Sequence, residues 1–202
     1  MLEALAAGTT TALDHAHVIV SPAHAKLAVA GTVSSGIRSV FCYMPTAIAS
    51  FNPMTFQPNP LQDWVMQTFS ELADHGPFGD GRVTMGFAWD LWFLGPEAVK
   101  SVFATVKEKG VRTVTTHGVS LYNITKILKD HDLLDERVVI SHGGLVSKED
   151  AEMIKESGAF ISSTPSTELQ MAMGRPLCFD ASFQGDAPEA NRVGYVSPIQ
   201  SI

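Results

Sequence analysis

The stretch VVISHGGLVSKEDAEMIKESGAFISSTPSTELQMAMG, residues 138–174, reads as a strand, a helix, a second strand and a second helix. Its first apolar run stops at His142 and two glycines. Ser147 and Asp150 then have the spacing of an N-terminal cap for a helix over 147–157, and Gly158 has the position of a C-terminal cap. Strands that alternate with helices in this way predict a parallel sheet covered by helices.

The same alternation extends over the rest of the chain. Short runs with β-branched or aromatic bias predict strands at 9–14, 37–43, 82–88, 111–116, 137–141 and 159–162. Helices are expected at 22–35, 61–75, 96–109, 120–130, 147–157 and 166–173. This order fits either a doubly wound open sheet or a β/α barrel. No G-x-G-x-x-G motif or P-loop follows a strand, which weakens the nucleotide-binding form of the open sheet.

Composition excludes several classes of function. The chain has 202 residues, of which 45% are apolar and 17% charged, as in ordinary globular proteins. Its net charge of -7 and its lack of a basic cluster argue against nucleic acid as a partner. Two isolated cysteines, Cys42 and Cys178, favour a reducing compartment. There is no apolar run long enough for a membrane span and no secretory signal pattern, so we expect a cytoplasmic protein with no membrane partner.

Histidines recur where the predicted strands end. His15 and His17 close the first strand, His117 the fourth and His142 the fifth. In a β/α barrel the C-terminal strand ends surround one mouth, where imidazoles from different strands can meet and bind a metal. His15 and His17 are two residues apart, which puts both rings on one face of an extended strand. The alternative is that such histidines are only satisfied polar groups, the interpretation we adopt for His24, His75 and His131.

Four blocks, in order, resemble the metal-dependent amidohydrolase superfamily in its triazine hydrolase, guanine deaminase and cytosine deaminase-like branch. They are LEALAAGTTTALDHAH, SPAHAKLAVAGTVSSGIRSVFCY, VTTHG and the stretch over 138–174, and they span residues 1–175. The resemblance implies a distorted (β/α)8 barrel with one divalent ion, usually zinc. It also implies hydrolysis of a C–N or C–halogen bond in a small-molecule substrate by a metal-activated water.

The resemblance also implies roles for particular residues. His117 matches a metal ligand at the end of a strand. His142 matches the histidine at the end of the next strand, which lies by the ion and polarises or deprotonates the attacking water. We therefore predict His117 and His142 as metal-site residues and His142 as catalytic. Ser163, Thr164 and Glu168 lie where the family places residues that contact substrate, so we predict that they bind it.

The sequence also departs from the family pattern. No His-x-His pair precedes the GTTT strand, no final strand ends in Asp, and Ser120 stands where the branch often carries a Glu. His15 and His17 align with the second strand of the family, so we do not assign them as replacements for the missing pair. Six β/α units can be counted where a closed barrel has eight. We expect an incomplete (β/α)8 TIM-type barrel over 1–175, strands two to seven of the family, and an irregular tail over 176–202.

These departures leave three hypotheses for function. The first is a zinc-dependent hydrolase of the amidohydrolase type, impaired or inactive as this chain alone, whose missing ligands come from a partner chain or from sequence outside these 202 residues. The second is a non-catalytic fragment or pseudoenzyme that acts as an oligomeric scaffold, and the third is a doubly wound binding domain. Exposed strand edges predict a homo-oligomer in the first two cases.

Three further segments have weaker local signals. The Pro- and Asn-rich segment 44–60 is predicted to be a loop, with the length of a lid over a barrel mouth. The aromatic residues of GFAWDLWFLG, residues 86–95, could line a pocket, but core packing is the commoner role. Asp14 is expected to cap the end of its strand rather than to orient a histidine ring.

Overall fold

The computed structural model describes residues 1–118, 123–143, 146–179 and 193–195 of the chain. The chain divides into two compact units, Met1–Val114 and Thr115–Ile202. Among the described residues, no helix combines the length and the apolar character that a membrane crossing requires.

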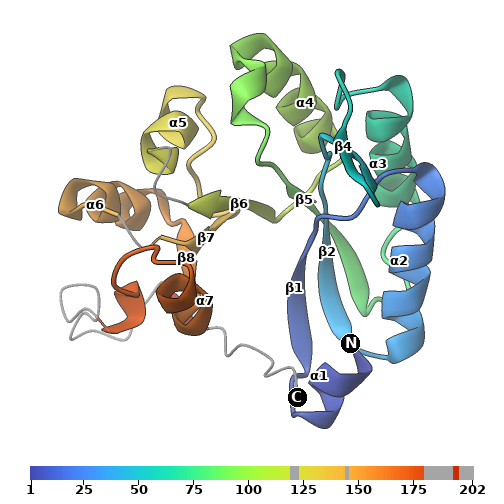
Figure 1. Ribbon diagram of the computed structural model, residues 1–202, viewed down its shortest axis with the longest axis horizontal. Helices are drawn as coiled ribbons and strands as arrows, with labels where there is room; N and C mark the ends of the chain where they lie inside the picture. Colours follow the sequence, from blue (N-terminus) through green and yellow to red (C-terminus); the bar gives the residue numbers. More distant parts are fainter. Residues whose placement is uncertain (119–122, 144–145, 180–192, 196–202) are drawn as a thin grey trace. The chain divides into compact units, whose positions relative to one another are not determined.

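The first unit is built on three parallel strands, β1 (Thr11–Ala16), β2 (Arg38–Tyr43) and β5 (Val83–Ala88), in the order β1-β2-β5 (Figure 1). His15 pairs with Cys42 and Cys42 with Gly86, so the C-terminal ends of the three strands are level with one another. The helices of this unit are α1 (Leu2–Ala6), α2 (Pro22–Ser35), α3 (Asp63–His75) and α4 (Pro96–Glu108), with a 3-10 turn, η1, at Trp92–Leu94. The helix α2 packs on β2 and β5 and against α3, and α3 packs against α4.

Aromatic side chains form much of the core of the first unit. Tyr43, Phe69, Phe87 and Trp89 are all fully buried. The rings of Phe69 and Phe87 meet edge to face with centroids 5.0 Å apart, and those of Phe87 and Trp89 stack at 6.2 Å. Rings at these separations add specific contacts to the burial of apolar area. Core packing is therefore the role of Phe87 and Trp89, whereas Phe93 is exposed.

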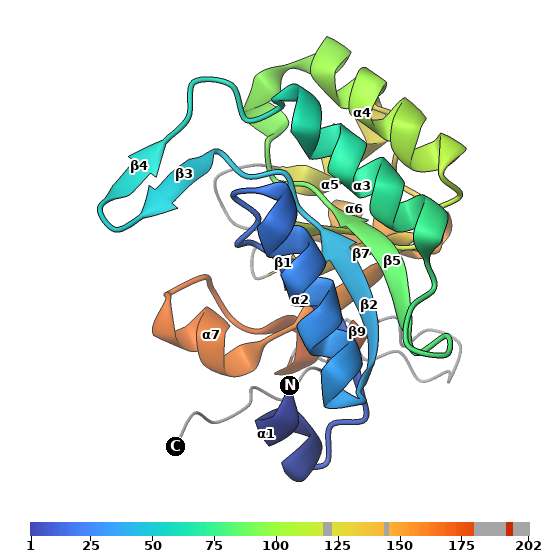
Figure 2. The same ribbon diagram turned by 90° about the vertical axis from the view of Figure 1, so that its right-hand side faces the viewer.

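The prediction that segment 44–60 is a loop throughout is wrong, because the segment contains two paired strands. Ile48–Phe51 (β3) and Met54–Phe56 (β4) pair as an antiparallel hairpin, which stands apart from the parallel strands of its unit (Figure 2). The hairpin is closed at its base by Gln57, whose backbone N–H donates to Ala47 O at 2.9 Å. The Pro and Asn content suggested a loop throughout, but β-branched and aromatic residues on both sides of the turn favour strand pairing.

The second unit holds β6 (Val114–Gly118), β7 (Val138–His142), β8 (Phe160–Ser163) and β9 (Val193–Tyr195), in the order β6-β7-β8-β9. β6 begins at the last residue of the first unit. β7 pairs with β8, and β8 with β9, in parallel. The helices are α5 (Ile124–Asp130), α6 (Lys148–Ser157) and α7 (Pro165–Gln170), with a 3-10 turn, η2, at Leu177–Phe179.

The caps predicted for the helix over 147–157 are both present. Ser147 Oγ accepts the N–H of Asp150 at 3.1 Å, and the Asp150 carboxylate accepts the N–H of Ser147 at 3.1 Å. Gly158 ends the helix in the left-handed conformation at φ 80°. This reciprocal arrangement satisfies two N–H groups that would otherwise lack a partner at the start of α6.

The predicted irregular tail contains a strand. Val193 pairs with Ile161, and Tyr195 with Ser163, so β9 extends the sheet of the second unit beyond β8. Residues 180–192 and 196–202 of the tail lie outside the described residues, as does Ser120. The outer edge of β8 is thus paired with a strand of the same chain.

Candidate metal centre

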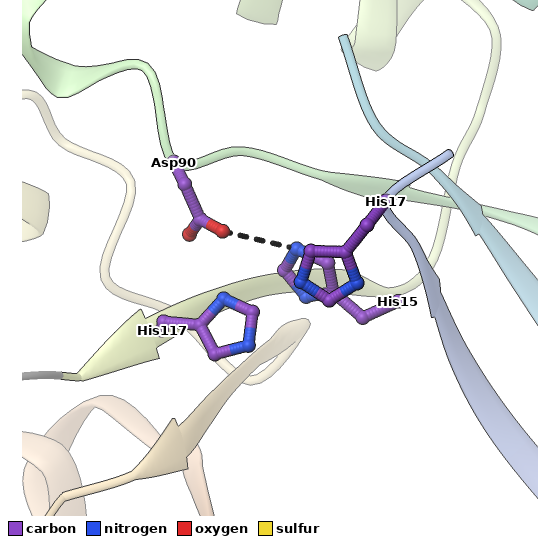
Figure 3. A group of neighbouring side chains, drawn as sticks. All are labelled: His15, His17, Asp90 and His117. Carbon is purple, nitrogen blue, oxygen red and sulfur yellow. Dashed lines mark ion pairs between the residues drawn. The ribbon is translucent and has the colours of Figure 1, made fainter. Parts of the chain in front are cut away.

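His15 and His17 bring two imidazoles to the end of β1. His15 lies within the strand and His17 follows its last residue. Their rings stack with centroids 4.6 Å apart and an interplanar angle of 25° (Figure 3). The alternation of side chains along an extended strand explains this, because residues i and i+2 share a face. The prediction that both rings lie on one face is confirmed.

Asp90 reaches the same place from β5. It follows the last residue of that strand by two positions, and its Oδ2 lies 3.1 Å from Nε2 of His15 (Figure 3). The His15 side chain is 8% exposed and that of Asp90 is 23% exposed. Because β1, β2 and β5 are parallel and level, their C-terminal ends deliver these groups to one edge of the sheet.

Each of these three side chains offers one ligand atom, and these atoms lie within 4.8 Å of one another. Ligands bound to zinc at 2.0 to 2.1 Å in a tetrahedron stand roughly 3.3 Å apart, which small side-chain movements from this arrangement would reach. Two imidazole nitrogens and one carboxylate oxygen form a donor set suited to zinc or Fe(II). Three protein ligands also leave a position open, as catalytic zinc sites do. The residues present therefore fit a divalent ion.

Asp14 and Cys42, which lie near this cluster in the sequence and the sheet, have a different character. Asp14 lies inside β1 and pairs with Phe41, so the expectation that it caps the strand end is wrong. Burial raises the pKa of the Asp14 carboxyl, and the nearby His15 offsets part of that effect. Burial and the Asp14 charge both raise the pKa of the Cys42 thiol far above its usual value, so this cysteine stays neutral.

The trio of His15, His17 and Asp90 was only partly visible in the sequence. The two histidines stood out at a strand end but were left out of the predicted metal site, because they match the second strand of the family. Asp90 was not singled out, since it lies within the aromatic segment 86–95. The sequence feature that could have identified Asp90 is its position just after a predicted strand, which is also the position of the histidines.

His117 and His142 lie together in the second unit. They occupy the ends of β6 and β7, and their rings stack with centroids 5.4 Å apart and an interplanar angle of 26°. Gly118 allows the two strands to approach, because a Cβ there would lie 2.6 Å from Cγ2 of Ile140. The structure thus brings together the two rings chosen from the sequence, and their roles as ligand and catalytic group stay predictions.

The three predicted substrate-binding residues form a hydrogen-bonded group that contacts His142 through Thr164. Nδ1 of His142 lies 2.5 Å from Oγ1 of Thr164 and 3.8 Å from Oε1 of Glu168. Ser163 and Glu168 are fully buried, and Ser163 Oγ donates to Glu168 at 3.1 Å. Substrate binding by these residues stays a prediction, but the hydrogen bonds of their side chains are with one another and with His142.

Comparisons with known proteins find solved structures of the same fold. A scan against protein-family models gives no match, and neither does a comparison with curated proteins. The chain is similar to an adenosine deaminase from Xanthomonas campestris with bound zinc, at a TM-score of 0.73 and 15% identity over 96% of this chain. It is also similar to the zinc complex of atrazine chlorohydrolase from Arthrobacter aurescens, at 0.71 and 18% over 97%. A guanine deaminase from C. acetobutylicum with bound guanine matches at 0.69 and 13% over 94%.

The matches cover about half of each of these larger proteins: 43% of the adenosine deaminase, 46% of the chlorohydrolase and 49% of the guanine deaminase. At such low identity the likeness establishes the fold. The parallel strands and covering helices are those of an incomplete TIM-type barrel, as the sequence predicted. The chain therefore has the fold of about half of each of these hydrolase and deaminase structures.

Proposed function

We propose that this chain is a metal-dependent hydrolase that cleaves a C–N or C–halogen bond in a small molecule, with a divalent ion, zinc in the first place, held by His15, His17 and Asp90. The observation that carries the proposal is the convergence of these three ligand atoms within 4.8 Å at the C-terminal ends of β1 and β5. An ion in such a site acts as a Lewis acid and lowers the pKa of water to about 7, which supplies a nucleophile at neutral pH.

The residues of the site have separate tasks in this proposal. Asp90 supplies the negative charge, and its contact with Nε2 of His15 holds that buried ring at the strand end. His17 is exposed and offers the second nitrogen. The close, partly buried grouping aligns the three donors before an ion arrives, which lowers the cost of ordering them on binding.

His142 is the candidate proton acceptor in this proposal. His142 ends β7 with its side chain almost buried, and an imidazole can accept a proton near neutral pH. His117 remains a predicted further ligand.

A substrate class follows from the structural neighbours. Their names give atrazine, adenosine and guanine as ligands or substrates, and all three are nitrogen heterocycles with an amino or chloro substituent. We propose the same class for this chain. Water would replace the amino or chloro substituent on the ring carbon, and the broken C–N or C–Cl bond would release ammonia or chloride.

Metal analysis tests the proposal. Zinc titration of the purified chain should give about one ion bound per chain and a rise in melting temperature, because a ligand that binds only the folded state stabilises it. His15→Ala, His17→Ala and Asp90→Asn should each weaken zinc binding at least about tenfold, since a catalytic site relies on about three protein ligands. The control is His24→Ala, which removes an exposed histidine of α2. If His117 is a further ligand, His117→Ala should also weaken zinc binding.

Two results would contradict the proposal. A metal-free wild-type protein whose melting temperature does not change with zinc would favour the non-catalytic scaffold. A zinc-loaded protein that releases neither ammonia nor chloride from amino- and chloro-substituted purines and triazines would contradict the hydrolase assignment while leaving the metal site in place.

A further inference from the structure

We infer that Glu168 is a positioning residue that acts through the Thr164 hydroxyl to hold His142 as the tautomer with its proton on Nδ1, leaving Nε2 as the basic nitrogen. The inference rests on the proposed function only for the use made of that base. The tautomer itself follows from the hydrogen-bonded group in the second unit.

Glu168 is an unusual carboxylate because it is fully buried yet surrounded by donors. Its Oε1 accepts the N–H of Thr164 at 2.6 Å, and its Oε2 accepts the Ser163 hydroxyl at 3.1 Å. An acid is rarely buried completely unless its oxygens are satisfied in this way. The group lies in the first turn of α7.

The Thr164 hydroxyl connects this carboxylate to the imidazole. Its Oγ1 lies 3.3 Å from Oε1 of Glu168 and 2.5 Å from Nδ1 of His142. A hydroxyl has a single proton, and a carboxylate can only accept. The Thr164 hydroxyl therefore donates to Glu168, and its oxygen accepts the N–H at Nδ1 of His142.

A second contact favours the same proton position. Oε1 of Glu168 lies 3.8 Å from Nδ1 of His142, so its negative charge attracts a proton at that nitrogen. The hydrogen bond made by one ring nitrogen determines which nitrogen carries the proton. Nε2 is then left with its lone pair, as a general base requires.

The backbone and the neighbouring ring restrict the same imidazole. His142 has φ 76°, a positive value that is uncommon outside glycine, although asparagine, aspartate and histidine adopt it more often than other residues. Its ring stacks on His117 at 5.4 Å, and the residue is 8% exposed. Strained residues of this kind persist where the surrounding structure fixes them, and they are concentrated at functional sites.

Nuclear magnetic resonance of the histidine rings tests the inference directly. Two-bond ¹H–¹⁵N correlation spectra of the full chain, at about pH 8.5 where an ordinary histidine is neutral, distinguish the two tautomers. His142→Asn assigns the signal and suits the left-handed backbone. We expect the wild-type His142 ring to show the pattern of the Nδ1–H tautomer.

The variants separate positioning from simple packing. Thr164→Val keeps the side-chain shape but removes the hydroxyl, so the two ring nitrogens should shift toward averaged values. Thr164→Ser restores the hydroxyl and should restore the wild-type pattern. Glu168→Gln should shift the ring as Thr164→Val does. Ser163→Ala removes a donor to Glu168 that does not contact His142, and should leave the pattern unchanged.

Several results would overturn the inference. They are a wild-type His142 ring in the Nε2–H form, a Thr164→Val spectrum equal to the wild type, or a Ser163→Ala spectrum that shifts as far as that of Thr164→Val. If Glu168→Gln fails to fold, the Thr164→Val and Thr164→Ser pair still decides the outcome. These readouts need neither metal nor turnover, so an inactive chain would contradict the proposed function and leave this result standing.

Discussion

At Gly86, the backbone of β5 passes close against side chains of β2. A Cβ at this position would lie 2.6 Å from Sγ of Cys42, 2.9 Å from Cγ1 of Val40 and 3.2 Å from the carbonyl oxygen of Thr113. All three neighbours lie in or beside packed strands and have little room to move. We expect Gly86→Ala to lower the free energy of unfolding by about 1 to 3 kcal/mol, the usual range for overpacking.

Urea denaturation measures this change, and Gly31 provides the control. Gly31 lies in α2, where an added Cβ would have no atom within 4 Å apart from its chain neighbours and the backbone of the helix itself. Gly31→Ala should raise the free energy of unfolding by about 0.5 to 1 kcal/mol, because alanine is the better helix former. Equal effects of the two substitutions would show that backbone entropy, and not the approach of β5 to β2, sets the cost at Gly86.

The candidate site shows which residues a sequence can reveal. His117 and His142 could be chosen because each follows a run rich in β-branched residues and is itself followed by glycine. Asp90 contacts His15 across 75 positions of sequence, through the level ends of β1, β2 and β5. Such a contact depends on strand order and register, which spacing along the chain does not encode. The burial of Glu168 was hidden for the same reason.

At the scale of elements, the connection from α5 to β7 is held by a close ion pair. Arg137 Nη2 lies 2.5 Å from Oδ2 of Asp135, and the backbone N–H of Arg137 donates to Oδ1 at 2.9 Å. Burial acts to raise the pKa of Asp135, but these hydrogen bonds outweigh it and the net pKa lies below the ordinary value of 3.8. The pair therefore stabilises the folded state at neutral pH.

The sign of the pH dependence follows from that shift. A carboxyl whose pKa is depressed on folding contributes stability above its unfolded value of 3.8, and loses it as the pH falls through the lower folded value. We expect Asp135→Asn to lower the free energy of unfolding at pH 7 by less than about 1 kcal/mol, since both groups are partly exposed. The difference should vanish near about pH 2.

Urea titrations of both proteins at the two pH values check this expectation. The control is Glu136→Gln, which removes a neighbouring exposed acid. A stability loss of the same size at both pH values would mean that Asp135 acts through the geometry of the turn and not through its charge.

Most elements could be predicted because local signals and tertiary packing agree. The capping residues Ser147 and Gly158 fix the ends of α6, and six of the parallel strands lie where apolar runs predicted them. The hairpin of β3 and β4 was not predicted, because the overall Pro and Asn content of segment 44–60 indicates a loop. Strand pairing depends instead on the individual residues beside the turn. β9 has only three residues, too few for a periodic signal.

For the whole molecule, self-association remains a prediction and can now be made more specific. β9 occupies the outer edge of β8. In the described part of the chain, no strand pairs with the outer edge of β1, which comes first in the strand order. A free edge of this kind presents unpaired N–H and C=O groups to a second copy. The homo-oligomer is therefore expected to form through β1.

Light scattering after size exclusion tests this expectation. Leu13 in β1 is 40% exposed, and Leu13→Lys should shift the protein toward the monomer, because charged side chains protect strand edges. Leu27→Lys is the control, since it places the same charge on the exposed face of α2. A wild-type protein that is monomeric at every concentration would contradict the prediction.

The pairing of β9 with β8 has a practical consequence for handling this protein. Residues 193–195 pair with β8, which lies about thirty residues earlier in the chain. A shortened protein that stops before residue 193 would leave the outer edge of Phe160–Ser163 without this partner. Phe160, the first residue of β8, is 40% exposed even with β9 in place. A protein truncated before residue 193 would therefore be prone to β-sheet aggregation during expression and storage, so residues 193–195 are best retained in any preparation.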